Sequence, residues 1–210
     1  YDRAFKYLEE GSTLRRKGMQ YTPEKDLHAI EMIRATFSRE VLERDIEGHV
    51  SAEPIFVIGM PRTGTTIVER ILSSHSVVRS AGESKAFAVQ LVNACSNVEG
   101  RPPDDVGGLI TRSINVDFVA LGEGYVNDAR PIGERVAHFV DKMPLNFLYA
   151  GLIHQALPKA KIVLLERDPM DTCFAIYKTL FEGVYPYSYD LVELANYFVA
   201  YKRLVKHWQD

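Results

Sequence analysis

Hydrophobic residues along this chain form two kinds of pattern, short continuous runs and longer stripes at helical spacing. The continuous runs are rich in Val, Ile and Phe and have the length of buried strands, at residues 54–59, 136–140 and 161–165. The stripes predict helices at residues 66–74, 86–95, 109–127, 145–156, 170–181 and 190–208. Stretches rich in Gly, Pro and Ser predict turns or loops at 80–85, 96–108 and 185–188. Strands that alternate with helices indicate an α/β fold with a parallel sheet built by right-handed crossovers.

The first fifty residues carry no strand pattern and are predicted to be helical. Apolar positions indicate one helix over residues 1–16 and a second, opened by Thr-Pro, over residues 22–47. We therefore divide the chain into an N-terminal helical extension, residues 1–50, and an α/β domain, residues 51–210. Because the chain does not begin with Met and ends inside a helical stripe, we expect it to be a piece of a longer polypeptide.

A glycine-containing loop follows the first predicted strand and leads directly into a helix. Free backbone N–H groups and the positive end of the helix dipole meet there, which is the geometry of an anion site. Gly59 and Gly64 have the spacing of a nucleotide P-loop, so we predict a P-loop-like three-layer fold, the central sheet flanked by helices. However, Thr65 stands where that motif has lysine, and the positive charge of the loop is Arg62. The loop therefore suits an anion held without a metal better than a metal-bound triphosphate.

Positively charged residues follow each of the three predicted strands. Arg62, Lys142 and Arg167 come after the first, second and third strand respectively. Ligands of open α/β sheets bind beyond the carboxyl ends of the strands. We therefore expect these three side chains to converge on one crevice.

Composition narrows the classes of function. The 210 residues are 46% hydrophobic and 25% charged, as in an ordinary globular protein. A formal net charge of −3 argues against a general nucleic-acid binder, which would carry a basic excess. Cys95 and Cys173 have neither disulfide-framework nor zinc-site spacing, so we expect reduced thiols and a cytoplasmic protein. No run reaches the roughly 18 apolar residues of a membrane span, and no spacing of residues predicts a metal site.

Four motifs together resemble a known family. They are Pro61-Arg-Thr-Gly-Thr-Thr66, Ala81-Gly-Glu-Ser84, Asp141-Lys-Met-Pro-x-Asn-Phe147 and Arg167-Asp-Pro-x-Asp-Thr-Cys173. In this order they resemble the sulfotransferases that use PAPS (3′-phosphoadenosine 5′-phosphosulfate). The most similar branch is the bacterial type fused behind tetratricopeptide repeats, itself similar to the tyrosylprotein sulfotransferases. The resemblance covers about residues 54–210, and the opening helices resemble the join between repeats and catalytic domain in that branch.

The resemblance implies a role for each matching residue. Glu83 would be the general base that takes the proton of an acceptor hydroxyl, and Lys142 would stabilise charge on the bridging oxygen of the leaving group. Arg62 would hold the sulfuryl group, and Arg167 would bind the 3′-phosphate. The remaining residues of the 5′-phosphosulfate loop would be Gly59, Pro61, Thr63, Gly64, Thr65 and Thr66. PAPS would be the donor, adenosine 3′,5′-bisphosphate the product, and no metal would take part.

Two departures from the family pattern bear on the 3′-phosphate. The family usually has a serine eight residues after the arginine, where this chain has Ala175. Either Thr172 or a neighbouring group substitutes for the serine, or 3′-phosphate binding is weakened. Family members also continue with a further strand and a basic loop that close over the adenosine. We therefore expect the C-terminal part of the domain to be missing. His75 and His138 are the rival bases, the first interpreted as a helix cap and the second as a hydrogen-bonded residue of a buried strand.

Other interpretations of function remain open from the sequence. A P-loop nucleotide kinase or NTPase is disfavoured by Thr65, and a non-catalytic, degenerate binding domain is the other alternative. The acceptor is any partner with a hydroxyl near the base: a tyrosine of a protein, a carbohydrate or a small molecule. Lys85 is a candidate contact of the acceptor or the sulfuryl group. The loop 96–108 and the aromatic turn 185–189 are candidate walls of the acceptor site, and the oligomeric state is not predicted.

Overall fold

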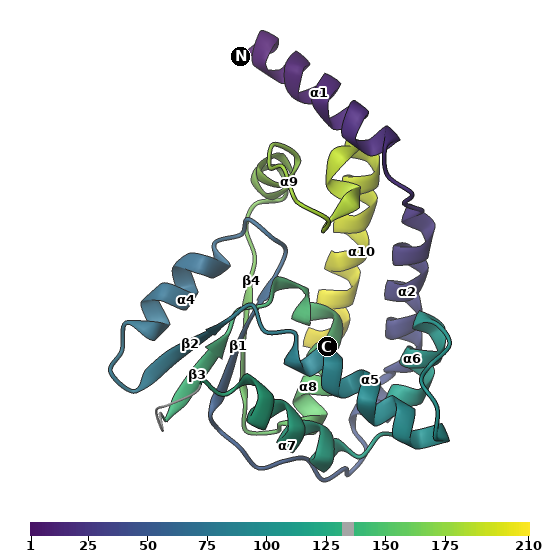
Figure 1. Ribbon diagram of the computed structural model, residues 1–210, viewed down its shortest axis with the longest axis vertical. Coiled ribbons are helices and arrows are strands. Elements are labelled where there is room, and N and C mark those ends of the chain that lie inside the picture. The colour runs from purple at the N-terminus through teal and green to yellow at the C-terminus, as the bar shows by residue number, and fades with distance from the viewer. Residues whose placement is uncertain (132–136) are drawn as a thin grey trace. The chain divides into compact units, whose positions relative to one another are not determined.

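The computed structural model describes residues 1–131 and 137–210 and divides into two compact units (Figure 1). The larger unit is Met32–Glu166, and the smaller combines Tyr1–Glu31 with Arg167–Asp210. Among the described residues, no helix has both the length and the apolar character needed to cross a membrane. The division predicted at residue 50 stays a prediction.

The larger unit is organised around a parallel sheet of four strands in the order β2-β3-β1-β4. The strands are β1 (Pro54–Gly59), β2 (Val78–Gly82), β3 (His138–Asp141) and β4 (Lys161–Leu165). β1 is buried along its whole length and pairs with β3 on one side and with β4 on the other. The predicted α/β three-layer fold with a central parallel sheet is confirmed.

The two faces of the sheet are covered by different helices, because side chains alternate along each strand. One face contacts α4 (Thr65–Ser73), and its apolar contacts are Ile55, Val57, Val78, Val140, Val68 and Leu72. The other face is aromatic and contacts α5 (Ala86–Glu99) and α7 (Phe118–Ala129). There the ring of Phe56 stacks on Tyr125 with centroids 5.1 Å apart, and Phe87 meets Phe56 edge-on. Figure 1 shows α4 on the opposite side of the sheet from α5 and α7.

Shorter helices complete the larger unit. They are α3 (Arg39–Leu42), α6 (Val106–Ser113), the 3₁₀-helix η1 (Pro144–Tyr149) and α8 (Ala150–Ala156), together with the end of α2 (Pro23–Thr36). Helices α7 and α8 approach closely at Gly122, where an added Cβ would lie 2.3 Å from the carbonyl oxygen of Ala156. The backbones of α7 and α8 are thus tightly packed at Gly122.

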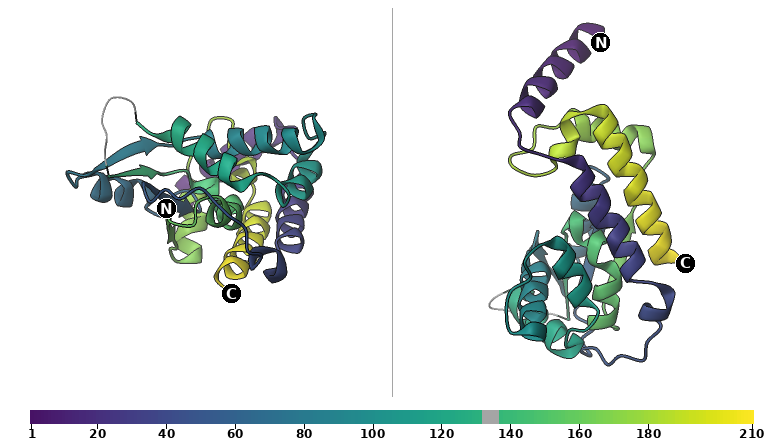
Figure 2. Two further views of the ribbon diagram at one scale, coloured as in Figure 1. Left: turned by 90° about the horizontal axis from the view of Figure 1, so that it is seen from below. Right: turned by 90° about the vertical axis from the view of Figure 1, so that its right-hand side faces the viewer.

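The smaller unit contains α1 (Asp2–Lys17), the start of α2, α9 (Pro169–Tyr177), the 3₁₀-helix η2 (Pro186–Tyr189) and α10 (Leu191–Gln209). In Figure 2, α10 is the long yellow helix, with α9 and η2 beside it. Arg16 of α1 makes a bidentate ion pair with Glu193 of α10, with nitrogen–oxygen distances of 2.8 Å. The rings of Tyr187 and Tyr197 stack with centroids 3.7 Å apart, which joins η2 to α10.

Several predicted boundaries are wrong, each for a local reason. The predicted turn 80–85 overlooks β2, which is an edge strand with a single buried residue, Val78. The helix predicted over 22–47 ends at Thr36, because extended backbone at Ser38 starts α3.

The single helix predicted over 109–127 is two helices, because the Asp117 carboxylate accepts the Ala120 N–H and caps α7. The loop predicted over 96–108 is shorter than expected, since α5 continues to Glu99 and α6 begins at Val106. Val136, the first residue of the predicted second strand, lies outside the described residues.

Candidate active site

The backbone of the loop between β1 and α4 has the left-handed conformations that an anion-binding loop needs. Gly59 has φ +141°, and an added Cβ would lie 2.5 Å from the carbonyl oxygen of Leu165, so only glycine fits. Arg62 has φ +67°, which is uncommon outside glycine and concentrates at functional sites. Gly64, at φ +105°, precedes α4, and no side chain caps that helix. The first N–H groups of α4 are therefore available to a ligand.

Some side chains of this loop are buried or hydrogen-bonded within the protein, and others are exposed to solvent. The Thr63 hydroxyl donates a hydrogen bond of 2.8 Å to the carbonyl of Met60 and so closes the loop on itself. Thr65 is buried, whereas Arg62 and Thr66 are exposed. The loop thus presents one guanidinium, one threonine hydroxyl and backbone N–H groups to solvent, all of which suit an anion.

Lys142 follows β3, the neighbour of β1 in the sheet, and lies between two carboxylates. Its ammonium donates a hydrogen bond to Oε1 of Glu83 and lies 4.0 Å from Oε2 of Glu69. The Lys142 and Glu69 side chains are 9% and 11% exposed, whereas that of Glu83 is 57% exposed. A buried cation is thus paired with one buried anion and with one that solvent or a ligand can reach.

A β-bulge in β2 directs the chain that carries Glu83. The pairing of β2 with β3 shifts register between Ser80 and Gly82, and Gly82 has φ +69°. The Gly82 carbonyl accepts the N–H of Lys142 at 2.9 Å, so the chain turns immediately after the last pairing. Bulges commonly re-aim side chains next to active sites, and here the next residue is Glu83.

Asp141, directly before Lys142, is fully buried beneath this cluster. The Tyr125 hydroxyl donates a hydrogen bond of 3.0 Å to its Oδ2. Burial raises the pKa of Asp141 to about 7, although the hydroxyl of Tyr125, the backbone of Ser84 and the side chain of Asn146 act in the opposite direction. Asp141 therefore carries a proton over much of the acid range and links β3, α7 and the chain beyond Glu83.

Arg167 lies in the smaller unit, whereas Arg62, Glu83 and Lys142 lie in the larger one. Its guanidinium donates to Asp171 one turn later at 3.1 Å, and Asp168 caps α9. The Thr172 hydroxyl donates to the carbonyl of Arg167 at 3.4 Å. The convergence of Arg62 and Lys142 with Arg167 stays a prediction, as does the substitution of Thr172 for the family serine at Ala175.

His75 and His138, the two rival candidates for the general base, each have a hydrogen-bond partner within the protein. Nδ1 of His75 accepts the N–H of Val77 just past the end of α4, and the C-cap of α4 is Ser74, so the His75 imidazole does not cap the helix as predicted. His138 is only partly buried, and its Nδ1 donates to the carbonyl of Ala52 at 2.9 Å, so its interpretation as a hydrogen-bonded strand residue is supported. Lys85 is exposed at the start of α5, and its proposed contact with acceptor or sulfuryl stays a prediction.

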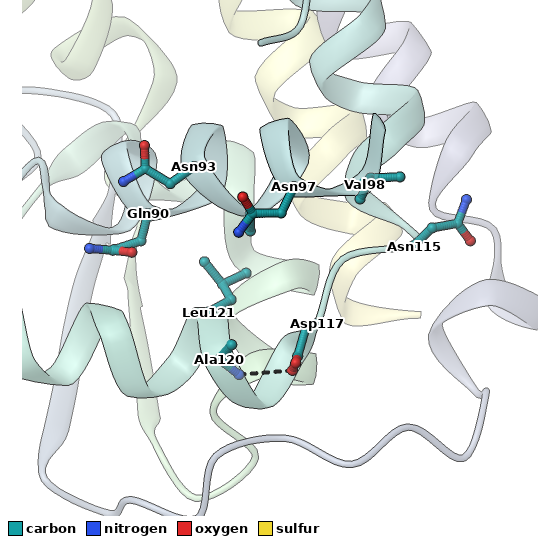
Figure 3. Close-up of a pocket in the computed structure, with 9 residues that line it drawn as sticks. Gln90, Asn93, Asn97, Val98, Asn115, Asp117, Ala120 and Leu121 are labelled. Atoms are coloured by element: carbon teal, nitrogen blue, oxygen red, sulfur yellow. Dashed lines mark hydrogen bonds between the residues drawn. The ribbon is translucent and has the colours of Figure 1, made fainter. Parts of the chain in front are cut away.

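A separate pocket of about 280 Å³ opens between α5 and α7 (Figure 3). It is lined largely by amides and small side chains: Gln90, Asn93, Ala94, Asn97, Val98, Asn115, Asp117, Ala120 and Leu121. None of the residues predicted to bind the donor or to act in catalysis belongs to it, although Asn97 and Val98 fall in the segment 96–108 predicted as a wall of the acceptor site. Two of its polar groups already have partners, since Gln90 donates to Asp128 and Asp117 accepts the N–H of Ala120.

Glu69 and Ser80 are members of the cluster that sequence reasoning missed. The Ser80 hydroxyl donates a hydrogen bond of 2.5 Å to Oε1 of Glu69 and accepts the N–H of Gly82 at 3.0 Å. A signal for Glu69 exists in the sequence, because it falls on the helical stripe that includes Thr65, Val68 and Leu72. A carboxylate on a buried stripe is unusual unless it has a partner.

Comparisons with known proteins identify the family of the chain. The family model described as "Sulfotransferase family" matches residues 54–210. The chain is 31% identical, over 99% of its length, to an uncharacterized protein of Aquifex aeolicus (strain VF5), of which it covers 28%. It is 25% identical, over 63% of its length, to protein-tyrosine sulfotransferase A of Caenorhabditis elegans, of which it covers 35%. The chain thus spans about a third or less of these relatives. Since the family model matches most of its length, the chain belongs to the sulfotransferase family.

Proposed function

We propose that this protein transfers the sulfuryl group of PAPS to an acceptor hydroxyl, with Glu83 as general base. One observation carries the proposal: the exposed carboxylate of Glu83 is hydrogen-bonded to the buried ammonium of Lys142. Lys142 follows β3, and the loop with Arg62 follows the neighbouring strand β1. A base, a cation and an anion-binding loop at the carboxyl edge of adjacent strands are what sulfuryl transfer requires.

The loop fits the phosphosulfate of the donor in its conformation and charge. Its left-handed residues Gly59, Arg62 and Gly64 leave backbone N–H groups free beside the uncapped start of α4. Arg62 supplies the positive charge, and the exposed hydroxyl of Thr66 supplies a further donor. Thr65 replaces the lysine that a nucleoside triphosphate would need, which favours a donor held without a metal.

The proposed reaction is a direct in-line transfer. Glu83 accepts the proton of the acceptor hydroxyl while that oxygen forms a bond to sulfur. The bond between sulfur and the bridging oxygen breaks, and its electron pair remains on the 5′-phosphate of adenosine 3′,5′-bisphosphate. Lys142 stabilises the charge that develops on this bridging oxygen, and Arg62 with the loop holds the sulfuryl oxygens. Such transfers depend on positioning and charge neutralisation, as phosphoryl transfer does.

We propose a hydroxyl acceptor and, from the relative named as a protein-tyrosine sulfotransferase, a tyrosine as the first acceptor to test. A tyrosine peptide reaches an exposed carboxylate readily, because Glu83 stands at a turn open to solvent. Arg167 is proposed to bind the 3′-phosphate. The fusion to tetratricopeptide repeats also stays a prediction.

The test measures sulfuryl transfer from PAPS to tyrosine peptides, carbohydrates and small alcohols, with and without EDTA. We expect transfer that is unaffected by EDTA and a fall in kcat of about 100-fold or more for Glu83→Gln, the range typical of general bases. Glu123→Gln, an exposed carboxylate of α7, is the matched control and should retain full activity. Arg167→Ala should weaken the binding of adenosine 3′,5′-bisphosphate far more than the binding of adenosine 5′-phosphate. Calorimetric binding of Mg-ATP in preference to the bisphosphate would refute the proposal.

A further inference from the structure

We infer that Glu69 is a positioning residue that keeps the Lys142 ammonium in place while Glu83 changes its charge. The inference rests on the proposed function for the roles of Glu83 and Lys142. It begins from the asymmetry of the two carboxylates around one cation. Glu83 is 57% exposed and lies on a turn, whereas Glu69 is 11% exposed and lies on the regular helix α4.

The orientation of the Glu69 carboxylate is fixed by Ser80. The Ser80 oxygen accepts the N–H of Gly82 at 3.0 Å, so its single proton is free to point the other way. That proton is donated to Oε1 of Glu69 at 2.5 Å. Oε2 is thereby left facing the Lys142 ammonium at 4.0 Å.

The proposed reaction removes one of the two anions around Lys142. With both glutamates ionised, the cluster of Glu69, Lys142 and Glu83 has a formal charge of −1, and it becomes neutral when Glu83 takes the proton. The buried ammonium then has Glu69 as its anion among the described residues. A buried charge that loses its partner is strongly disfavoured, so Glu69 keeps the ammonium inside the site.

The protonation of Glu83 also favours the departure of the leaving group. While the Lys142 ammonium donates an N–H to Glu83, that donor is not available to the bridging oxygen. Protonation of Glu83 weakens that hydrogen bond, and Glu69, at the longer distance of 4.0 Å, anchors the ammonium without enclosing it. The donor that Glu83 gives up thus becomes available to the leaving oxygen when negative charge develops there, while the ammonium stays beside Glu69.

Glu69→Gln tests the inference, because glutamine keeps an oxygen for Ser80 and removes the charge. We expect kcat to fall about 10- to 100-fold, as when a catalytic group is misplaced, while calorimetric affinity for adenosine 3′,5′-bisphosphate changes less than about threefold. Glu123→Gln is the matched control. Unchanged kcat, or a loss of bisphosphate affinity equal to the loss of kcat, would overturn the inference.

A second readout does not depend on activity. In ¹⁵N side-chain spectra the Lys142 ammonium, assigned with Lys142→Arg, should exchange its protons with water faster in Glu69→Gln than in the wild type. An unchanged exchange rate would overturn the inference. If the wild type transfers no sulfuryl group, the proposed function fails, and this readout alone decides whether Glu69 holds Lys142. Should Glu69→Gln not fold, Ser80→Ala serves the same spectra, since it frees the Glu69 carboxylate without removing its charge.

Discussion

We expect the free energy of unfolding of Asp141→Asn, relative to that of the wild type, to increase as the pH rises from acid to neutral and alkaline values. Asp141 is fully buried, and burial raises its pKa from 3.8 to about 7. Asparagine resembles the protonated acid in shape, and its side-chain oxygen can still accept a hydrogen bond from the Tyr125 hydroxyl. The substitution therefore removes the cost of ionising the buried group while leaving its main hydrogen bond in place.

The magnitude follows from the difference between the folded and unfolded pKa of Asp141. Because the folded value is the higher one, the folded state holds a proton that the unfolded state releases between pH 3.8 and about 7. The stabilisation that the raised pKa of Asp141 gives the wild type is complete below pH 3.8. It is lost as the pH rises from 3.8 to about 7. A shift of about three units corresponds to ~4 kcal/mol at ~1.4 kcal/mol per unit. We expect the free energy of unfolding of Asp141→Asn, relative to the wild type, to rise by ~2–4 kcal/mol between pH 4.5 and 8.

Urea unfolding followed by far-UV circular dichroism at several pH values from 4.5 to 8 measures this difference. Glu53→Gln is the matched control with the opposite sign. The bidentate ion pair with Arg130 lowers the pKa of Glu53, so its contribution is present at neutral pH and is lost as the pH falls through the lowered pKa. A difference between Asp141→Asn and the wild type that stays constant from pH 4.5 to 8 would refute the reasoning.

Two glycine substitutions test the close backbone contacts by the same urea assay. Gly59→Ala places a Cβ 2.5 Å from the Leu165 carbonyl oxygen at φ +141° and should cost more than ~3 kcal/mol, whereas Gly100→Ala, at φ +69° in open space, should cost only ~1–2 kcal/mol. Gly122→Ala meets a backbone carbonyl of α8 at 2.3 Å and should cost ~2–3 kcal/mol; Gly11→Ala, within α1 and in open space, should instead stabilise by ~0.5–1 kcal/mol. Equal effects within either pair would contradict the assigned contacts.

Strand β1 and the loop after it could be predicted from sequence because each has a strong local cause. Residues 54–59 form a nearly continuous apolar run, and a strand in the middle of a parallel sheet needs such a run. Residues 161–165 also form an apolar run and are a strand, although β4 is an edge strand with no buried residue. The glycine at position 59 is required by the carbonyl of Leu165, which lies opposite it in the register. Sequence pattern and backbone geometry therefore agree at β1, which is buried along its whole length.

The edge strand β2 and the breaks between helices were harder to predict. β2 has one neighbour, β3, and needs only Val78 to be buried, so its Ser, Ala and Gly residues resemble a turn. The break between α6 and α7 depends on the carboxylate of Asp117, one short polar residue within an otherwise continuous apolar stripe. Local propensity cannot decide such places, since the sheet order and the capping bond become known only with the fold.

The pairing of Lys142 with two carboxylates follows from sheet order rather than from any local pattern. β3 lies between β1 and β2, so the chain that leaves β1 and the chain that leaves β2 both pass the carboxyl end of β3. The first contributes Glu69 through α4, and the second contributes Glu83 beyond the bulge. A lysine at the end of the edge strand β2 would have had one neighbouring strand to supply an anion. The place of Lys142 after an interior strand is therefore what brings two carboxylates from different elements to one ammonium.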